Sequence, residues 1–459
     1  MSSTIYNDNA YDDIMDYPMN RSIIYGAGRY WVFYCPERAN ISYRSSDDNG
    51  TTWDSPIVID SNIYRKVDFS VYSSDGTIIH TCYAREDPTW KTVYYRRGTL
   101  NADGTITWDI EREVVPTDNV NQQSYVCVTA DSNSIPVIFY GFWVNPDYYQ
   151  HVVRANDTLG SSWGSTLRIG TIAGNLYANP MVLPDGKLFV TMQQNTPTVH
   201  TKSLLYDGSW SEDSSIPATI THGYCYQAKV DLGGTVHYAY IDGNDYHTQY
   251  LTWDTISGWG STVEVDSSEN QQYGPIALLL HNDIPYIFKG YSDDIIMYNG
   301  GDSWSKETVV TAEAGTIWYL RMSTSDRRGS SDDYGINWLI TPAPNLDLKF
   351  STVIISDLST FEITAVTTDV SYVIRTGNNT ITIVADFTDP NDYTAGEYKC
   401  WMWFRNNNVG DAYTIGPYEA TVGKLASTSY SATLSLDPTT EWVRNYDVSI
   451  AVDLCHSAE

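Results

Sequence analysis

A chain of 459 residues is long enough for two domains that each bury a core of their own. Its 56 acidic side chains outnumber 27 basic ones, and the net charge of −29 at pH 7 repels phosphate backbones, so we expect no nucleic-acid partner. No run of about 18 apolar residues occurs, so we also expect no membrane span.

The first residues of the chain do not show the pattern of an export signal. Met1-Ser2-Ser3-Thr4 lacks a basic stretch followed by an apolar run, so the sequence predicts no signal peptide. The acidic composition favours solubility in a salty or crowded extracellular setting. We therefore expect an extracellular, cell-surface or virion-surface protein, either already processed or carried out of the cell by another route, such as a virus particle.

The clearest motif is the octet from residue 46 to residue 53, which reads S-x-D-x-G-x-T-W. Weaker copies follow at 156–163, 206–210 and 301–304. The final tryptophan returns at Trp108, Trp163, Trp210, Trp259 and Trp304. The spacing of about 45 to 55 residues is too long for a helical or heptad repeat, and it is typical of one β-propeller blade.

The octet resembles the Asp-box of BNR-repeat β-propellers, which include sialidases and related glycan-active or glycan-binding proteins. The resemblance implies a turn between the third and fourth strands of a blade. In such a turn the aspartate caps backbone N–H groups, the glycine takes a positive φ and the tryptophan wedges between blades. The structural positions that the resemblance assigns are Ser46, Asp48, Gly50, Thr52, Trp53, Trp163, Trp210, Trp259 and Trp304.

Apolar, aromatic-rich strands recur once per repeat and predict seven blades. These second strands are expected at 29–34, 76–84, 135–142, 186–192, 234–240, 284–290 and 334–340. A first strand precedes each hairpin turn and a third strand follows, so four strands per unit predict an all-β, seven-bladed β-propeller over residues 1–353. The seventh unit lacks a clear fourth strand, and we expect residues 5–6 or 22–25 to supply it.

The pattern changes from about residue 354. Approximate period-two alternation at 363–367, 380–386, 398–404, 430–434 and 446–452 predicts an immunoglobulin-like β-sandwich over residues 354–459. Such modules space, dock or oligomerise their neighbours, so we expect assembly of copies through this domain. Cys400 and Cys455 both lie in it and are predicted to form a disulfide. The other cysteines are expected to be buried free thiols: Cys35, Cys82, Cys127 and Cys225.

Catalytic signatures are weak. A sialidase-like mechanism needs three arginines around a carboxylate, and the Arg-Ile-Pro motif of that family is not matched by Arg21-Ser22-Ile23. Arg65, Arg85 and Arg321 are the nearest candidates for such a triad. Propeller-shaped lyases use His, Tyr and Arg, but His80 and His237 are expected to be hydrogen-bonded core residues. We therefore lean against an enzyme, with catalytic residues unknown, no metal ligands and no cofactor beyond a structural calcium ion.

The connections from strand four to the next blade and from strand two to strand three lie on one face of a propeller, here called the ligand face. Aromatic rings stack on sugars and polar groups bind their hydroxyls, so this face is the predicted glycan site, centred on residues 83–92 and 141–151. The alternative is that these rings only pack blade against blade. The predicted ligand-binding residues are Tyr64, Arg85, Trp90, Gln122, Trp143, Tyr148, Tyr149, Tyr177, His222, Tyr246, Tyr273 and Trp318.

We therefore expect a non-catalytic recognition or adhesion protein whose propeller binds a glycan or another cell-surface ligand. Two alternatives stay open. One is a structural subunit of a surface layer, filament or virion. The other is a divergent glycoside hydrolase or polysaccharide lyase.

Overall fold

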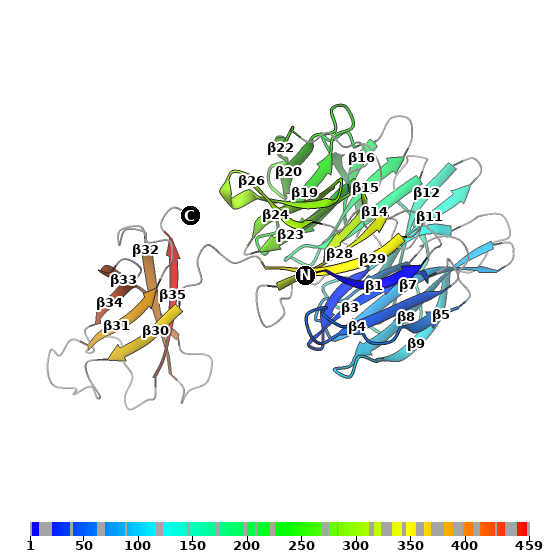
Figure 1. The fold of residues 1–459 in the computed structure, drawn as a ribbon. Coiled ribbons are helices and arrows are strands. Elements are labelled where there is room, and N and C mark those ends of the chain that lie inside the picture. The colour runs from blue at the N-terminus through cyan, green and yellow to red at the C-terminus, as the bar shows by residue number, and fades with distance from the viewer. Residues whose placement is uncertain are drawn as a thin grey trace. The chain divides into compact units, whose positions relative to one another are not determined.

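A computed structural model gives the fold of the chain as two compact units, Met1–Ile355 and Ser356–Glu459 (Figure 1). Strands dominate both units. The residues that the structure describes are 2–8, 21–36, 40–61, 69–87, 90–115, 123–144, 147–169, 175–195, 200–206, 209–220, 225–268, 275–281, 283–311, 316–322, 333–341, 346–354, 362–368, 381–388, 398–406, 414–426, 429–436 and 448–456. Within these ranges no helix is long and apolar enough to cross a membrane.

The first unit is the predicted seven-bladed β-propeller, built from seven antiparallel sheets. Blade 1 contains β2 (Ile23–Gly26), β3 (Arg29–Tyr34), β4 (Ile41–Ser46) and β5 (Ile57–Asp60). Blade 2 contains β6 (Phe69–Tyr72), β7 (Ile78–Asp87), β8 (Trp90–Leu100) and β9 (Ile106–Val115). Blade 3 contains β10 (Gln123–Ala130), β11 (Pro136–Val144), β12 (Asp147–Arg154) and β13 (Leu167–Arg168).

The remaining blades follow the same plan. Blade 4 contains β14 (Asn175–Val182), β15 (Leu188–Asn195), β16 (His200–Tyr206) and β17 (Trp210–Ser215). Blade 5 contains β18 (Tyr226–Val230), β19 (Val236–Ile241), β20 (Thr248–Asp254) and β21 (Gly258–Trp259), with β22 (Val263–Asp266) also paired to β20. Blade 6 contains β23 (Ile276–His281), β24 (Ile284–Tyr291), β25 (Asp294–Asn299), the short 3-10 helix η3 (Gly300–Asp302) and β26 (Ser305–Thr311).

The N-terminal strand closes the ring. Blade 7 contains β27 (Thr316–Met322), β28 (Asp333–Thr341), β29 (Leu346–Ile354) and, as its outermost strand, β1 (Ser3–Asp8). Figure 1 shows the dark blue β1 beside the yellow β29, to which it pairs antiparallel. This confirms the first of the two predicted closing segments, because residues 23–25 of the second segment belong to β2, the first strand of blade 1. Closure also explains why blade 7 needs no turn between its third and fourth strands.

The octet from Ser46 to Trp53 forms the turn between β4 and β5. Asp48 Oδ1 accepts a hydrogen bond from the Thr52 amide at 2.8 Å, and the Ser46 hydroxyl accepts one from the Gly50 amide at 2.8 Å. Gly50 has φ +79°, and a Cβ there would lie 2.1 Å from the Phe350 ring of blade 7. The local sequence therefore sets the turn, and the glycine lets the two ends of the propeller approach each other.

We predict that Asp48→Asn destabilises the protein at neutral pH but hardly at all in strong acid. Burial raises the pKa of Asp48, but hydrogen bonds from Thr52, Ser46 and Thr51 outweigh it and lower the pKa from 3.8 to about 2. A carboxyl whose pKa is lowered by folding stabilises the fold above its unfolded pKa, and that contribution is lost as the pH falls through about 2. Because Asp48 is exposed, we expect only about 1 kcal/mol at neutral pH.

Denaturant titration of both proteins at neutral pH and near pH 2 tests the Asp48 prediction. The difference in unfolding free energy should shrink in acid. An equal difference at both pH values would mean that Asp48 acts through packing rather than through its charge.

The repeated tryptophans occupy equivalent places. Each of five rings contacts an aromatic ring of the preceding blade at centroid distances between 4.8 and 6.1 Å. The pairs are Trp53 with Phe350, Trp163 with Tyr95, Trp210 with Phe139, Trp259 with Phe189 and Trp304 with Tyr250. In blade 2, Trp108 instead packs against an apolar cluster shared with blade 1. The indole rings therefore link successive blades.

The turn from Asn156 to Trp163 reaches the same result with a shifted sequence. Asp157 lies one position earlier than Asp48 does in the octet, yet it accepts hydrogen bonds at 3.0 Å from the amides of Leu159 and Ser161. The capping role therefore follows the carboxylate rather than the motif position. The four cysteines of the propeller are buried thiols, as expected, and none is in a disulfide: Cys35, Cys82, Cys127 and Cys225.

Among its described residues, the second unit holds six antiparallel strands in the order β30-β31-β34-β33-β32-β35. They are β30 (Glu362–Thr368), β31 (Ile381–Thr388), β32 (Tyr398–Asn406), β33 (Thr414–Ala426), β34 (Ser429–Leu436) and β35 (Val448–His456). The 13-residue β33 pairs with β32 through its first half and with β34 through its second half.

The two C-terminal cysteines lie on neighbouring strands of this unit. Cys400 on β32 pairs with Leu454, and Lys399 pairs with Cys455 on β35, so the cysteines stand one position out of register. Their side chains lie outside the described part of the structure. The Cys400–Cys455 disulfide therefore stays a prediction.

Candidate functional site

Two long hairpins rise on the ligand face. The predicted loops at 83–92 and 141–151 are almost entirely strand, because β7 and β8 pair as far as Asp87 and Trp90, and β11 and β12 as far as Val144 and Asp147. β7 and β8 have 10 and 11 residues, whereas β3 and β4 of blade 1 have 6 each. These two hairpins, β7–β8 and β11–β12, are called the long hairpins below. They hold their residues on regular, hydrogen-bonded backbone.

The structure places some of the predicted ligand-binding residues on these hairpins. Trp90 begins β8, and Trp143 stands directly opposite Tyr148 in the β11–β12 ladder. Tyr177 and Trp318 lie instead on the innermost strands of blades 4 and 7. The backbone of these five residues is described but their side chains are not. Four further predicted residues lie outside the described residues: Tyr64, Gln122, His222 and Tyr273.

The guanidinium of Arg168 lies over the ring of Tyr149. Tyr149 stands opposite Phe142 across the β11–β12 ladder, and the guanidinium carbon of Arg168 lies 3.5 Å from its ring centroid. His151, two residues after Tyr149 on the same strand, contacts the Phe142 ring edge-on at 5.0 Å. Burial, aided by Arg168, lowers the pKa of His151 although the Tyr149 carbonyl raises it, so the imidazole is neutral at pH 7. Blade 3 therefore presents aromatic surface beside a cation and a neutral imidazole.

Arg85 on β7 is held by carboxylates. It forms ion pairs with Asp60 of blade 1 and with Glu111, the latter at 3.2 Å, and its guanidinium carbon lies 4.1 Å from the Tyr94 ring centroid. Burial lowers the pKa of Arg85, but the Asp60 carboxylate outweighs this and raises it. Because its charge is compensated inside the protein, Arg85 is poorly suited to the carboxylate triad of a sialidase. The other two candidates for the triad cannot be placed beside it: Arg65 lies outside the described residues, and only the backbone of Arg321 is described.

Three buried histidines pair with tyrosine hydroxyls in the propeller core. The Nδ1 atoms of His80, His237 and His281 lie 2.7, 2.6 and 2.8 Å from the hydroxyls of Tyr95, Tyr250 and Tyr334. Burial lowers the pKa of His80 to about 4, so it stays neutral at pH 7. These contacts confirm the core interpretation of His80 and His237.

Arg21 crosses the middle of the propeller, a role that the sequence did not suggest. It precedes β2 of blade 1 and donates hydrogen bonds to the carbonyl of Val128 in blade 3, at 3.2 Å, and to that of Pro180 in blade 4. Its guanidinium carbon also lies 5.3 Å from the Tyr72 ring centroid of blade 2. Because blades 1 and 4 are three places apart in a ring of seven, the side chain joins nearly opposite blades. A lone arginine in a connection carries no sequence signal for this.

Tyr246 lies in the β19–β20 connection of blade 5, also on the ligand face. It has φ +66° and packs half-buried against the apolar core of that blade. Its backbone amide donates to the Asp242 carbonyl at 3.1 Å. Tyr246 therefore stabilises its own connection while it stays partly exposed.

Comparison with known proteins finds no matching protein-family model and no matching curated protein sequence. Among solved structures, an ulvan lyase of a new polysaccharide lyase family, bound to -[GlcA(1-4)Rha3S]-, has a TM-score of 0.55 at 12% identity over 76% of this chain and 95% of that chain. A second ulvan lyase structure gives a TM-score of 0.53 at 11% identity with the same coverage. A Hadza microbial sialidase has a TM-score of 0.42 at 12% identity over 69% of this chain and 74% of that chain. At these identities the likeness to the ulvan lyase shows a shared propeller fold.

Proposed function

We propose that this chain is a recognition or adhesion protein, extracellular or exposed on a cell or virion surface, whose propeller binds a glycan through its ligand face. The observation that carries the proposal is the pair of long hairpins: the β11–β12 ladder has aromatic residues at two successive paired positions, and Trp90 lies at the end of the β7–β8 ladder. Strand-borne residues are better fixed than loop-borne ones, so a ligand meets a preorganised surface.

The chemistry of the described side chains supports a sugar ligand. The Tyr149 ring, with the Arg168 guanidinium over it, combines an apolar face with nearby hydrogen-bond donors. Sugars present the matching combination of apolar C–H faces and hydroxyls. Because Arg85 is already neutralised and the chain carries a net charge of −29, neutral glycans fit this face better than polyanions.

We further assign the turn from Ser46 to Trp53 to the Asp-box type, and the second unit to the immunoglobulin-like sandwiches. The hydrogen bonds around Asp48 and the Trp53–Phe350 contact support the first assignment. The change of partner halfway along β33, from β32 to β34, supports the second, because a strand that changes partner in this way can join two sheets. In this proposal the sandwich spaces the propeller or links copies of the chain.

We predict that Tyr149→Ala and Trp143→Ala each weaken binding to an immobilised panel of neutral and acidic glycans by about tenfold, as expected for an aromatic contact in a small interface. Their melting temperatures should stay within about 2 °C of the parent, because the backbone hydrogen bonds of the hairpin are kept in both variants. Leu232→Ala is the matched control, since this side chain is 86% exposed in the β18–β19 turn on the opposite face.

Two outcomes would contradict the glycan proposal. Folding and binding lost in parallel by Trp143→Ala would favour the packing interpretation of these rings. Equal weakening by Leu232→Ala would show that binding does not depend on the ligand face.

A divergent polysaccharide lyase or glycoside hydrolase is the second candidate, and the fold shared with an ulvan lyase is the observation in its favour. Incubation with uronate polymers, followed by the ultraviolet absorbance of unsaturated uronate, and with a chromogenic sialoside would detect either activity. Turnover that survives Tyr149→Ala but not substitution of a titratable residue on the ligand face would replace the recognition proposal.

A structural subunit remains the third candidate, and light scattering that shows large ordered assemblies would favour it.

A further inference from the structure

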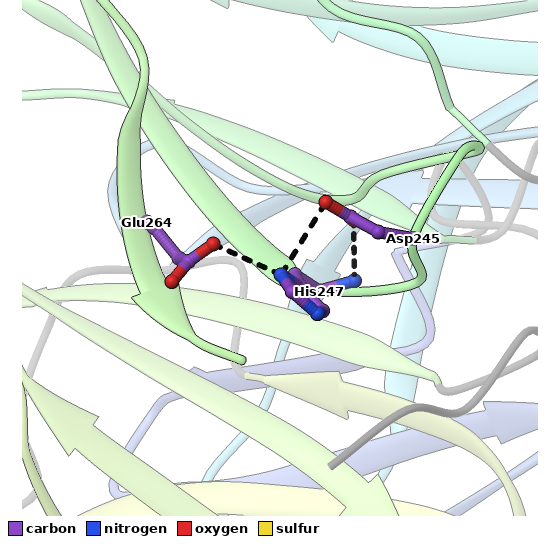
Figure 2. Close-up of side chains that lie close together, drawn as sticks. All are labelled: Asp245, His247 and Glu264. Atoms are coloured by element: carbon purple, nitrogen blue, oxygen red, sulfur yellow. Dashed lines mark hydrogen bonds and ion pairs between the residues drawn. The ribbon is translucent and has the colours of Figure 1, made fainter. Parts of the chain in front are cut away.

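A histidine and two carboxylates converge on one point of blade 5. Asp245 and His247 lie in the β19–β20 connection, and Glu264 lies on β22, which pairs with β20 (Figure 2). His247 Nδ1 is 3.3 Å from Asp245 Oδ2 and 2.9 Å from Glu264 Oε2. One potential ligand atom from each residue lies within 4.8 Å of the other two. Figure 2 shows the imidazole between the two carboxylates.

The backbone holds this cluster in place. The His247 amide donates to Asp245 Oδ1 at 3.0 Å, which leaves Oδ2 turned toward the imidazole. The Asp242 amide donates to the His247 carbonyl at 2.9 Å, and the Gly243 amide to the Thr219 carbonyl at 2.8 Å. The connection is thus fixed at both ends before any ligand arrives. A preorganised donor set loses little conformational entropy when it binds a cation.

A single proton on His247 Nδ1 cannot form a good hydrogen bond to both carboxylates at once. One ring nitrogen carries at most one hydrogen, and here it faces oxygens of two different carboxylates. A divalent cation accepts an electron pair from all three atoms at once, and the net charge of −29 raises the local concentration of cations. A set of one imidazole and two carboxylates suits Zn²⁺, whereas Ca²⁺ prefers six or more oxygens.

We propose that Asp245, His247 and Glu264 form a Zn²⁺ site on the ligand face. The imidazole is 19% exposed and the two carboxylates about half exposed, so the cluster opens to solvent. Three protein ligands leave the fourth tetrahedral position open, which is the arrangement of reactive rather than purely structural zinc sites. The site goes beyond glycan recognition, because zinc binding requires no sugar. No sequence motif predicts the site, because Glu264 follows His247 by 17 residues, which is not a zinc-binding spacing.

Isothermal titration of the chelator-treated full chain with ZnCl₂ tests this site. We expect one saturable site, with affinity at least about 100-fold weaker in His247→Ala and in the isosteric double variant Asp245→Asn/Glu264→Gln. The double variant Asp302→Asn/Glu307→Gln is the control, because it removes the same charge from exposed carboxylates of blade 6. X-ray absorption of the zinc-loaded protein should show nitrogen and oxygen ligands at about 2.0–2.2 Å.

The outcomes separate the zinc proposal from the glycan proposal. No saturable zinc binding, tighter binding of Ca²⁺ than of Zn²⁺, or an equal loss in the control variant would each overturn the zinc site. None of these results bears on the glycan panel with Tyr149→Ala, which is read in the absence of zinc. Weakened zinc binding in Asp245→Asn/Glu264→Gln with an unchanged melting temperature of the zinc-free protein would support the site.

Discussion

A chain that begins at Arg21, and so lacks β1, is expected to lose its cooperatively folded propeller. Without β1 the outer edge of β29 has no partner, and exposed strand edges promote aggregation. The deletion also removes Ile5, which is 1% exposed within an apolar cluster shared by blades 7 and 1. The Trp53 indole loses its hydrogen bond to the Ser3 hydroxyl, which measures 3.0 Å. We expect a loss of more than about 4 kcal/mol, among the largest for a single change.

Calorimetry of the truncated chain measures this loss, and a peptide of residues 2–8 added in excess provides the rescue. The peptide should restore the transition by pairing with β29, whereas the same peptide with Ile5→Asp should not. A truncated chain with the melting temperature of the full chain would show that the ring does not depend on this strand.

Arg21→Met is expected to give the second large effect. Its guanidinium donates to carbonyls of blades 3 and 4, so the substitution leaves buried acceptors without their charged donor. Hydrogen bonds to charged groups contribute about 1.5–3 kcal/mol each, and we expect a loss of about 3 kcal/mol in total. Arg112→Met is the matched control, because Arg112 is exposed on β9 and bonds only the adjacent Glu111 carbonyl among its described contacts.

Chemical denaturation of both arginine variants gives the comparison. A loss confined to Arg21→Met would establish that a single side chain ties blades across the ring. Equal small losses in the two variants would mean that the central contacts of Arg21 contribute little to stability.

The propeller could be read from the sequence because each blade repeats the same local chemistry. The second strands recur at the predicted positions, from Arg29–Tyr34 in blade 1 to Asp333–Thr341 in blade 7. The octet around Asp48 sets its turn through hydrogen bonds within eight residues, so no distant partner is needed. The unclear fourth strand of the last repeat pointed to the N-terminus, where β1 lies. The local repeat was therefore sufficient to predict the propeller architecture.

The candidate site was harder to predict because its residues do not recur at the spacing of the blades. Residues 83–92 include Arg85-Glu86-Asp87-Pro88, a polar run with a proline that is typical of loops, yet strand pairing continues on both sides of the turn. Pairing between β7 and β8 makes this region strand rather than loop, and such pairing cannot be predicted from the sequence of one strand alone. Arg21 and the Asp245–His247–Glu264 cluster depend on contacts between segments that only the closed ring or a folded blade brings together.

The proposed carbohydrate-binding surface lies on the two long hairpins. The most direct measurement is a crystal structure of the full chain with the best-bound glycan of the panel. We expect density for the sugar against the β7–β8 and β11–β12 hairpins, with a ring stacked on Trp90, Trp143 or Tyr149. Density on the opposite face, or only on the second unit, would contradict the account.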